Sequence, residues 1–514
     1  MQNDGSRAAK AAQGLPGNCI RVCKSLQVGY CEAMRDHYSA PARARILEFL
    51  GGRTPGTITC HYITAGNCDT AHHENPPSPV EHLPRFFAEG KEIGRSCWDR
   101  EMLLADLDIE YVNYDFPAEA FLDPYRSFHL QEPVTEAALE MLAAHGISPL
   151  QLISGRGHHF IWGIDRASSA FERLALLGQV SPSLAAHYAQ PAPPAGEVVD
   201  PKLGRAYAGL SRVMEFVAHH IKRTAAPRCK VPVELTAVLV GPVERGREMI
   251  SIDLSEYGDP LTIRTVRVPF SPYFKANQQR GVLGAEICAN LPPLFCLPMQ
   301  GLELTEALEL MRRPEEVSAH AQTGTTRIPD QSAATERLLD AYQESHLRRF
   351  HDWYYLEAPH GPEKWPETYD RTPMGPLPAC ARYILEHPND LLLQPSGIER
   401  VVRVLLSLGH HPRHIAGLIQ SKYDRDFDWG GQWHGYDPAS RADFYTRLFT
   451  GLFVTGTDDL IAFNSQSARE HKLLPDEHCS DNLEPYRQSL LERRKHERLA
   501  HRPFNRLFLP GEHL

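Results

Sequence analysis

Two aspartates one residue apart inside an apolar run constrain this chain more than any other feature. They are Asp106 and Asp108 in the run LLADLDIEY. A β-strand repeats every two residues, so both carboxylates project from one face while Leu103, Leu107 and Ile109 serve the core. Two neighbouring carboxylates raise each other's pKa unless a cation neutralises them. The pair therefore predicts a divalent-metal site, with a shared proton or a solvated strand end as the alternatives.

The composition is that of an ordinary globular protein. The chain has 514 residues, of which 42% are hydrophobic, enough for two to four domains with their own cores. It contains no apolar run of about 18 residues, and its polar N-terminus lacks the apolar core of a secretion signal. We therefore expect a cytoplasmic protein with no membrane partner. The formal net charge of -10 excludes a globally basic surface, so any nucleic-acid groove must be local.

Eleven cysteines scattered through a large chain predict mostly reduced thiols rather than a disulfide framework. The closest group, Cys19, Cys23 and Cys31, fits no zinc spacing. A second group offers zinc-type ligands but is equally compatible with an ordinary loop: Cys60, His61, Cys68, His72 and His73. We assign a metal to neither group.

Periodicity divides the chain into four parts. We expect a leading segment over 1–75, a mixed domain over 76–312, a polar linker over 313–335, and a helical domain over 336–514. The second part reads as a strand around the two aspartates, an amphipathic helix, and then two strands joined by a glycine turn. This order predicts an α+β fold. In the last part, candidate helices lie at 334–350, 377–387, 398–408, 413–423 and 439–452.

The glycine turn, SGRGHH at 154–159, is the second group of candidate site residues after the aspartate pair. Glycines let a backbone approach a ligand closely, while the Ser154 hydroxyl and the Arg156 guanidinium suit phosphate oxygens. The alternative is a turn that only reverses the chain. Strand alternation puts His158 and His159 on opposite faces, so at most one of them points into a site.

The third constellation begins at Asp253, an acid that ends the apolar run MISID. Strand-terminal aspartates commonly cap turns, but this one also offers a third carboxylate for a two-metal site, in which two cations lie about 3.5 to 4 Å apart. The basic residues Arg264, Arg267 and Lys275 then serve phosphates or a nucleic-acid backbone, unless they are ordinary strand surface.

The ordered set resembles the catalytic core of the archaeo-eukaryotic primase, or primase-polymerase, superfamily over about residues 95 to 280. The resemblance implies an RRM-like fold within the domain at 76–312 and a nucleotidyltransferase acting in DNA replication. It makes Asp106, Asp108 and Asp253 the catalytic ligands of Mg²⁺ or Mn²⁺. It also implies nucleoside triphosphates and a single-stranded DNA template as partners. The nucleotide-binding residues it implies are Ser154, Gly155, Arg156, Gly157, His159, Arg267, Ser271 and Lys275.

The helical part contains the runs PLPACARYIL at 376–385, PNDLLLQPSGIERVVRVLLSLGHHPRHIAGLI at 388–419 and YDPASRADFYTRLFTGLFVTGTDDLIAFNSQS at 436–467. These runs resemble the helical accessory domain of primase large subunits, which typically holds an iron–sulfur cluster on four cysteines. This chain departs from that pattern, because the region contains only Cys380 and Cys479, with Ser465 where a cysteine is expected. His471 or His478 would complete an altered zinc site. We expect a helical domain without a cluster.

Two rival functions use the same residues. A metal-dependent nuclease also combines acids with histidine, although the histidine, bulky residue, histidine order of paired-histidine nickases is missing here. A nucleic-acid-binding protein without catalysis is the other rival, and the presence of all three acids argues against it.

Overall fold

The computed structural model describes residues 37–67, 70, 74–236, 247–278, 283, 287, 291–425, 436–473 and 482–500. Contacts between Cα atoms divide the chain into two compact units. The first unit comprises residues 1–178, 188–207 and 261–336, and the second comprises 179–187, 208–260 and 337–514. Most of the leading segment predicted at 1–75 lies outside the described residues.

The described residues form a mixed α and β protein, as the sequence predicts. Four strands of the first unit lie side by side in the order β3-β5-β4-β9, and each neighbouring pair is antiparallel. Their bounds are β3 (Met102–Asn113), β4 (Leu150–Ile153), β5 (Gly157–Asp165) and β9 (Leu297–Pro298). A separate antiparallel sheet has the order β1-β2-β8, with bounds Ile63–Gly66, Glu92–Ser96 and Thr265–Arg267.

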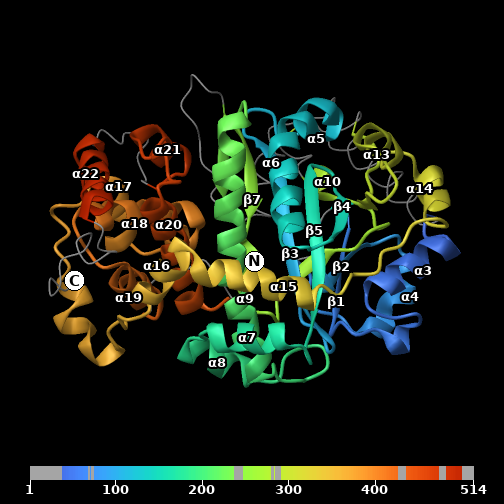
Figure 1. The fold of residues 1–514 in the computed structure, drawn as a ribbon, viewed down its shortest axis with the longest axis horizontal. Coiled ribbons are helices and arrows are strands. Elements are labelled where there is room, and N and C mark those ends of the chain that lie inside the picture. The colour runs from blue at the N-terminus through green and yellow to red at the C-terminus, as the bar shows by residue number, and fades with distance from the viewer. Residues whose placement is uncertain are drawn as a thin grey trace, which may run out of the picture. The chain divides into compact units, whose positions relative to one another are not determined.

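Helix α6 (Pro124–Ala144) packs against β3 and β5 (Figure 1). Its buried residues include Phe128, Gln131, Val134 and Ala138, spaced three or four apart as an amphipathic helix requires. The other helices that lie within this unit are α3 (Ala40–Phe49), α4 (Leu83–Ala88), α5 (Glu119–Leu122), α7 (Ser169–Leu177), α10 (Lys275–Gln278), α13 (Leu304–Leu310) and α14 (Pro314–His320).

Two patterns in the sequence overstate the length of a regular element. The run TITCHYI at 57–63 has the composition of a strand, but it contributes only its last residue to β1. The run at 168–188 has a largely helical composition, but it forms two helices, α7 and α8 (Pro182–Tyr188). Gly178 ends the first helix and a proline begins the second. The predicted linker at 313–335 contains α14, so it is not a structureless connection.

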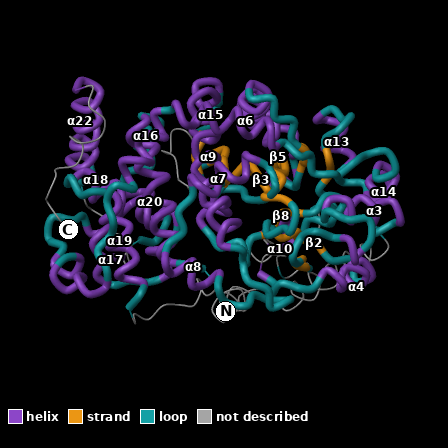
Figure 2. The backbone as a smooth tube through the Cα atoms, turned by 60° about the horizontal axis from the view of Figure 1, so that its bottom comes forward, coloured by secondary structure: helices purple, strands orange, loops and turns teal. Residues whose placement is uncertain are grey.

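The second unit is largely helical, and residues 337–500 contain described helices and loops but no described strand (Figure 2). Helix α9 (Pro201–Ala225) enters it from the first unit, as does α15 (Ser332–Glu344). The remaining helices are α16 (His346–Tyr354), α17 (Ala379–Glu386), α18 (Pro395–Ser407), α19 (Pro412–Tyr423), α20 (Pro438–Thr455), α21 (Ser465–Glu470) and α22 (Glu484–Ala500). Two short parallel strands complete it, β6 (Val233–Leu235) and β7 (Glu248–Asp253).

The one helix predicted over 334–350 is interrupted. Ser345 caps a new helix there, because its hydroxyl accepts a hydrogen bond from the backbone N–H of Arg348. The predictions for α17, α18, α19 and α20 agree with the structure to within about three residues, a normal uncertainty for helix ends.

A buried ionic network occupies the second unit. The Glu215 carboxylate on α9 lies 3.0 Å from Nε2 of His351 and is also paired with Arg447 of α20. The Tyr342 hydroxyl lies 2.7 Å from Nδ1 of the same histidine. These polar groups satisfy one another, which a buried ionic network requires.

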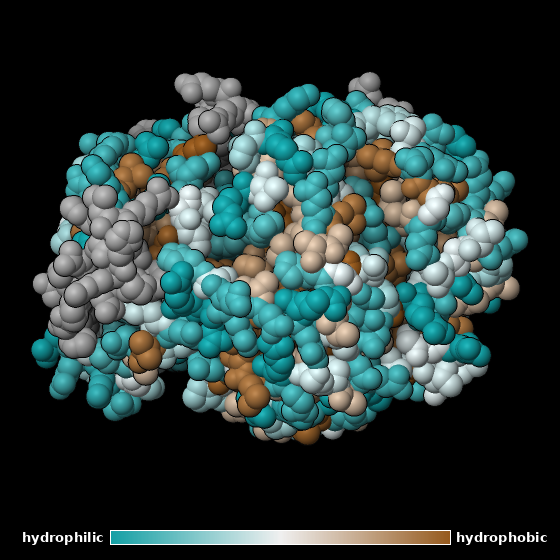
Figure 3. Space-filling model, in the orientation of Figure 1, coloured by the Kyte–Doolittle hydropathy of each residue, from teal (hydrophilic) through white to brown (hydrophobic). Residues whose placement is uncertain are grey.

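The described residues on the face drawn in Figure 3 are mainly hydrophilic, with smaller hydrophobic areas between them. No helix among the described residues is long and apolar enough to cross a membrane.

Candidate functional site

Strands β3 and β5 bring the aspartate pair next to a histidine. Their antiparallel register sets Asp108 directly opposite His159, and Asp106 opposite Ile161. Residues that lie opposite each other share a face of the sheet, and so do residues two apart on one strand. Asp106, Asp108 and His159 therefore lie together on one face.

The imidazole of His159 lies between the two carboxylates. Its Nδ1 atom lies 3.2 Å from Oδ2 of Asp106, and its Nε2 atom lies 3.8 Å from Oδ1 of Asp108. Burial opposes protonation of His159, but the charges of Asp108 and Asp106 outweigh it and raise the pKa of the imidazole to about 10. The potential of the two aspartates therefore keeps the His159 imidazole protonated at neutral pH.

His158 points to the opposite face, as strand alternation requires. Its ring meets the ring of Phe128 on α6 edge-on, with 5.3 Å between the ring centres. Burial lowers the pKa of His158 to about 3, with a further contribution from the charge of His159. His158 is therefore a neutral core residue, which agrees with the choice of His159 as the site histidine.

Glu110 is a member of this face that the sequence interpretation missed. It lies two residues after Asp108 on β3, opposite Gly157. Its carboxylate is paired with the guanidinium of Arg156 and lies 3.1 Å from Nζ of Lys275. Burial works against the charge of Glu110, but Arg156 and Lys275 hold the pKa of its carboxyl well below the ordinary value. The same two-residue spacing that selected Asp106 and Asp108 continues to Glu110, so the signal was present in the run LADLDIE.

The glycines of the turn are required by packing. A Cβ atom on Gly155 would lie 2.5 Å from the ring of Tyr273, and one on Gly157 would lie 1.9 Å from the carbonyl oxygen of Ile109. The backbone N–H and the hydroxyl of Ser154 both donate to the carbonyl oxygen of Gly157, at 2.8 and 3.3 Å. The Tyr273 ring and strand β3 therefore occupy the space beside Gly155 and Gly157 that the sequence predicts to be open to a ligand.

The predicted residues Arg267 and Ser271 belong to two different environments. Arg267 is paired with Glu92, and its guanidinium lies 4.2 Å from the ring centre of Tyr273. Ser271 is fully buried, and its hydroxyl accepts hydrogen bonds from the backbone of Ile93 at 2.7 Å and from Tyr38 at 3.3 Å. The Ser271 hydroxyl is enclosed and ties β2 to the chain around residue 271.

Asp253 ends β7 in the second unit. Its carboxylate accepts hydrogen bonds from the backbone N–H of Ser255 at 2.8 Å and from the hydroxyl of the same serine at 3.1 Å. These are the bonds of a turn-capping aspartate, the alternative that the sequence offered for this residue.

The donors on the β3 face suit a hard divalent cation. Mg²⁺ prefers oxygen ligands and is commonly held by one or two carboxylates, with water and substrate phosphates completing its shell. Asp106 is 3% exposed, so its carboxylate combines burial with a carboxylate neighbour, a combination that favours a bound cation. Within the part of the chain that the structure describes, no group of three or more Asp, Glu, His or Cys side chains is arranged to hold a metal ion. A cation here would therefore rely on the two aspartates and on its substrate.

The cysteines and histidines considered as zinc or cluster ligands have other contacts or lie outside the described residues. Cys380 is fully buried within α17, and Cys60 is a buried thiol whose pKa burial raises to about 12. His61 stacks on Trp98 with 3.9 Å between ring centres. The residues outside the described part are Cys19, Cys23, Cys31, Cys68, His72, His73, His478 and Cys479.

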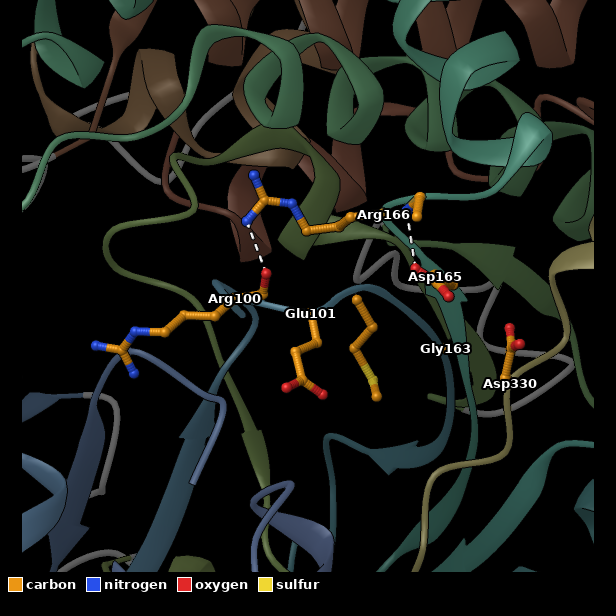
Figure 4. Close-up of a pocket in the computed structure, with 8 residues that line it drawn as sticks. Arg100, Glu101, Gly163, Asp165, Arg166 and Asp330 are labelled. Carbon is orange, nitrogen blue, oxygen red and sulfur yellow. Dashed lines mark hydrogen bonds between the residues drawn. The ribbon is translucent and has the colours of Figure 1, made fainter. Parts of the chain in front are cut away.

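A separate cavity of about 430 Å³ lies at the other end of the same two strands (Figure 4). It is lined by Arg100, Glu101, Met102, Gly163, Asp165, Arg166, Ala167 and Asp330. Met102 precedes Asp108 by six residues, so the two ends lie about 20 Å apart at about 3.4 Å per residue. The arginines are already engaged, since Arg166 lies 2.6 Å from Asp200 and Arg100 lies 3.1 Å from Glu197. We therefore place the candidate site at the charged residues of the β3 face rather than in this cavity, which does not extend to them.

Comparison with known proteins adds no relative. No protein-family model matches the chain, and no significant match is found among curated proteins or solved structures. The function must therefore be argued from the site itself.

Proposed function

We propose that this protein is a nucleotidyltransferase with an RRM-like primase-polymerase core. It adds nucleotides to a growing strand as directed by a template. The observation that carries the proposal is the shared face of Asp106, Asp108 and His159, two acids and a histidine on neighbouring strands. Its support from sequence is the order of the motifs, from the acid pair through the glycine turn to Asp253 and the basic segment.

In this proposal Asp106 and Asp108 hold Mg²⁺ or Mn²⁺. When bound, the cation lowers the pKa of the attacking 3′-hydroxyl and stabilises charge on the transferring phosphate. His159 orients the phosphates and contributes to the electrostatics of the site. Arg156 and Lys275 are the residues that bind the triphosphate, and pyrophosphate leaves from their side. Single-stranded DNA and nucleoside triphosphates are the proposed partners.

The test is a primer-extension assay with labelled template, nucleotides and Mn²⁺. We expect the double variant Asp106→Ala, Asp108→Ala to lose extension to below detection, because nothing remains to hold the cation. Asp165→Ala is the matched control, since it removes an exposed aspartate at the far end of β5. Circular dichroism must show that both variants are folded.

The same assay separates the rival functions. Cleavage of the labelled strand by the unaltered protein identifies a nuclease, and retention of the strand without reaction identifies a binding protein. Undiminished extension by the double variant contradicts the site assignment.

A further inference from the structure

The Glu110 carboxylate holds two cations, one on each oxygen. Arg156 is paired with Oε2 and Lys275 with Oε1. A carboxylate and a phosphate are both oxyanions that accept charge-assisted hydrogen bonds from such groups. Glu110 therefore occupies the place of an anion between two cations, on the same face as Asp106 and Asp108.

Two buried donors beside this arrangement have no hydrogen-bond partner within the described part of the chain. They are Nε of Arg156 and the hydroxyl of Tyr273. Tyr273 is 1% exposed and lies against the turn that carries Arg156, since its ring occupies the position of a Cβ on Gly155. A buried donor that lacks an acceptor destabilises the folded state. This destabilisation is removed when a ligand supplies the acceptor.

The cluster is open to solvent on one side. The Lys275 side chain is 33% exposed, whereas those of Arg156 and Glu110 are 17% and 15% exposed. An anion can therefore approach past Lys275 and reach the guanidinium. The ligand chemistry that fits is a polyphosphate, because it presents several acceptor oxygens to the lysine, the arginine and the tyrosine at once.

We propose that Arg156, Tyr273 and Lys275 form a polyphosphate subsite and that Glu110 is an internal anion which the polyphosphate displaces. The inference rests on the proposed function, in which Arg156 and Lys275 bind the triphosphate, and it adds Tyr273 as a donor and Glu110 as a competitor. The Glu110 side chain rotates away while its backbone stays in β3. Because the polyphosphate must displace the Glu110 carboxylate, Glu110 weakens phosphate binding. When no phosphate is bound, Glu110 keeps the half-buried cations Arg156 and Lys275 paired with an anion.

The test measures binding of inorganic pyrophosphate by isothermal titration calorimetry, with EDTA present and without nucleic acid. Glu110→Gln removes the competing charge but keeps the shape of the side chain. We expect it to bind pyrophosphate about tenfold more tightly or better, since a charge-assisted hydrogen bond is worth about 1.5 to 3 kcal/mol. Tyr273→Phe removes only the hydroxyl, and we expect it to bind about fivefold more weakly.

Glu119→Gln is the matched control. The Glu119 side chain is 13% exposed and is paired with Arg126, so this variant also removes a carboxylate from a half-buried arginine pair of the first unit. Its affinity for pyrophosphate should stay that of the unaltered protein. Equal or weaker binding by Glu110→Gln overturns the inference, and so does unchanged binding by Tyr273→Phe if Glu110→Gln does not fold.

The outcome is independent of the extension assay. If the unaltered protein extends primers while the pyrophosphate affinities do not change, the inference fails and the proposed function stands. If the affinities change as expected while no extension occurs, the polyphosphate subsite stands and the proposed polymerase activity fails.

Discussion

Two buried histidines of this protein pair with carboxylates, and yet their pKa values are shifted in opposite directions. His159, on the β3 face of the first unit, has its pKa raised to about 10, because Asp108 and Asp106 outweigh the effect of burial. His351, in the helical second unit, has its pKa lowered to about 4, because burial dominates and Arg447 and Arg212 oppose the charge of Glu215. The carboxylate is common to both places, and the arginines are not.

The pKa of an imidazole reports the electrostatic potential around it. In the second unit Arg447 compensates Glu215, so the network is closed and holds helices together. On the β3 face the potential of Asp106 and Asp108 instead keeps the His159 imidazole protonated at neutral pH. A strongly shifted pKa within a cluster of acids is typical of a functional site, whereas a balanced buried network is typical of a structural element.

The largest expected effect comes from breaking the balanced network. Arg447→Met should destabilise the protein by about 3 to 5 kcal/mol, because it leaves the buried Glu215 carboxylate without its arginine. Denaturant unfolding followed by circular dichroism measures the change. Adding Glu215→Leu to this variant should recover part of the loss, because no buried charge then remains without a partner.

Arg348→Met is the control for that prediction. Arg348 is paired with Asp352 on the surface of α16, where its side chain is 27% exposed and that of the aspartate is 52% exposed. Its replacement should change stability by no more than about 0.5 kcal/mol. A loss as large as that of Arg447→Met would show that any arginine pair of these helices is equally important.

The two histidines should also give opposite dependences of stability on pH. The folded pKa of His159 lies above its ordinary value of 6.5, so its stabilising contribution is complete below pH 6.5 and is lost as the pH rises towards 10. The folded pKa of His351 lies below 6.5, so its contribution is present above pH 6.5 and is lost as the pH falls towards 4.

Measurements of unfolding free energy in EDTA test this contrast. The difference between the unaltered protein and His159→Gln should shrink between pH 6.5 and 9.5. The difference between the unaltered protein and His351→Gln should shrink between pH 6.5 and 5. Parallel pH profiles for the two variants would contradict the contrast between a negative face and a balanced network.

The smallest expected effect concerns His158, the neighbour of the site histidine. Within the described residues its buried Nδ1 has no hydrogen-bond partner, and its ring packs against Phe128. His158→Phe should therefore be neutral or stabilising by up to about 1 kcal/mol, because it removes a buried polar atom without an acceptor. Primer extension by this variant should persist, whereas His159→Phe should lose it. Equal losses would place both histidines in the site.

Prediction from sequence succeeded where a pattern of period two or 3.6 acts locally. Alternation along β3 placed Asp106 and Asp108 on one face, and it separated His158 from His159. Helical periodicity located α17 to α20. Local patterns failed where a short polar residue changes the course of the chain, as at Ser345, which begins a new helix within a continuous helical pattern.

The amino-acid sequence by itself determined which acids share a strand face, because a strand repeats every two residues whatever surrounds it. Only the tertiary structure decided which charges meet that face. Lys275 follows Glu110 by 165 residues, and their pairing depends on how separate segments pack. The burial of Ser271 and the closure of the Glu215 network were decided in the same way, because burial and compensation are properties of neighbours that are distant in the chain.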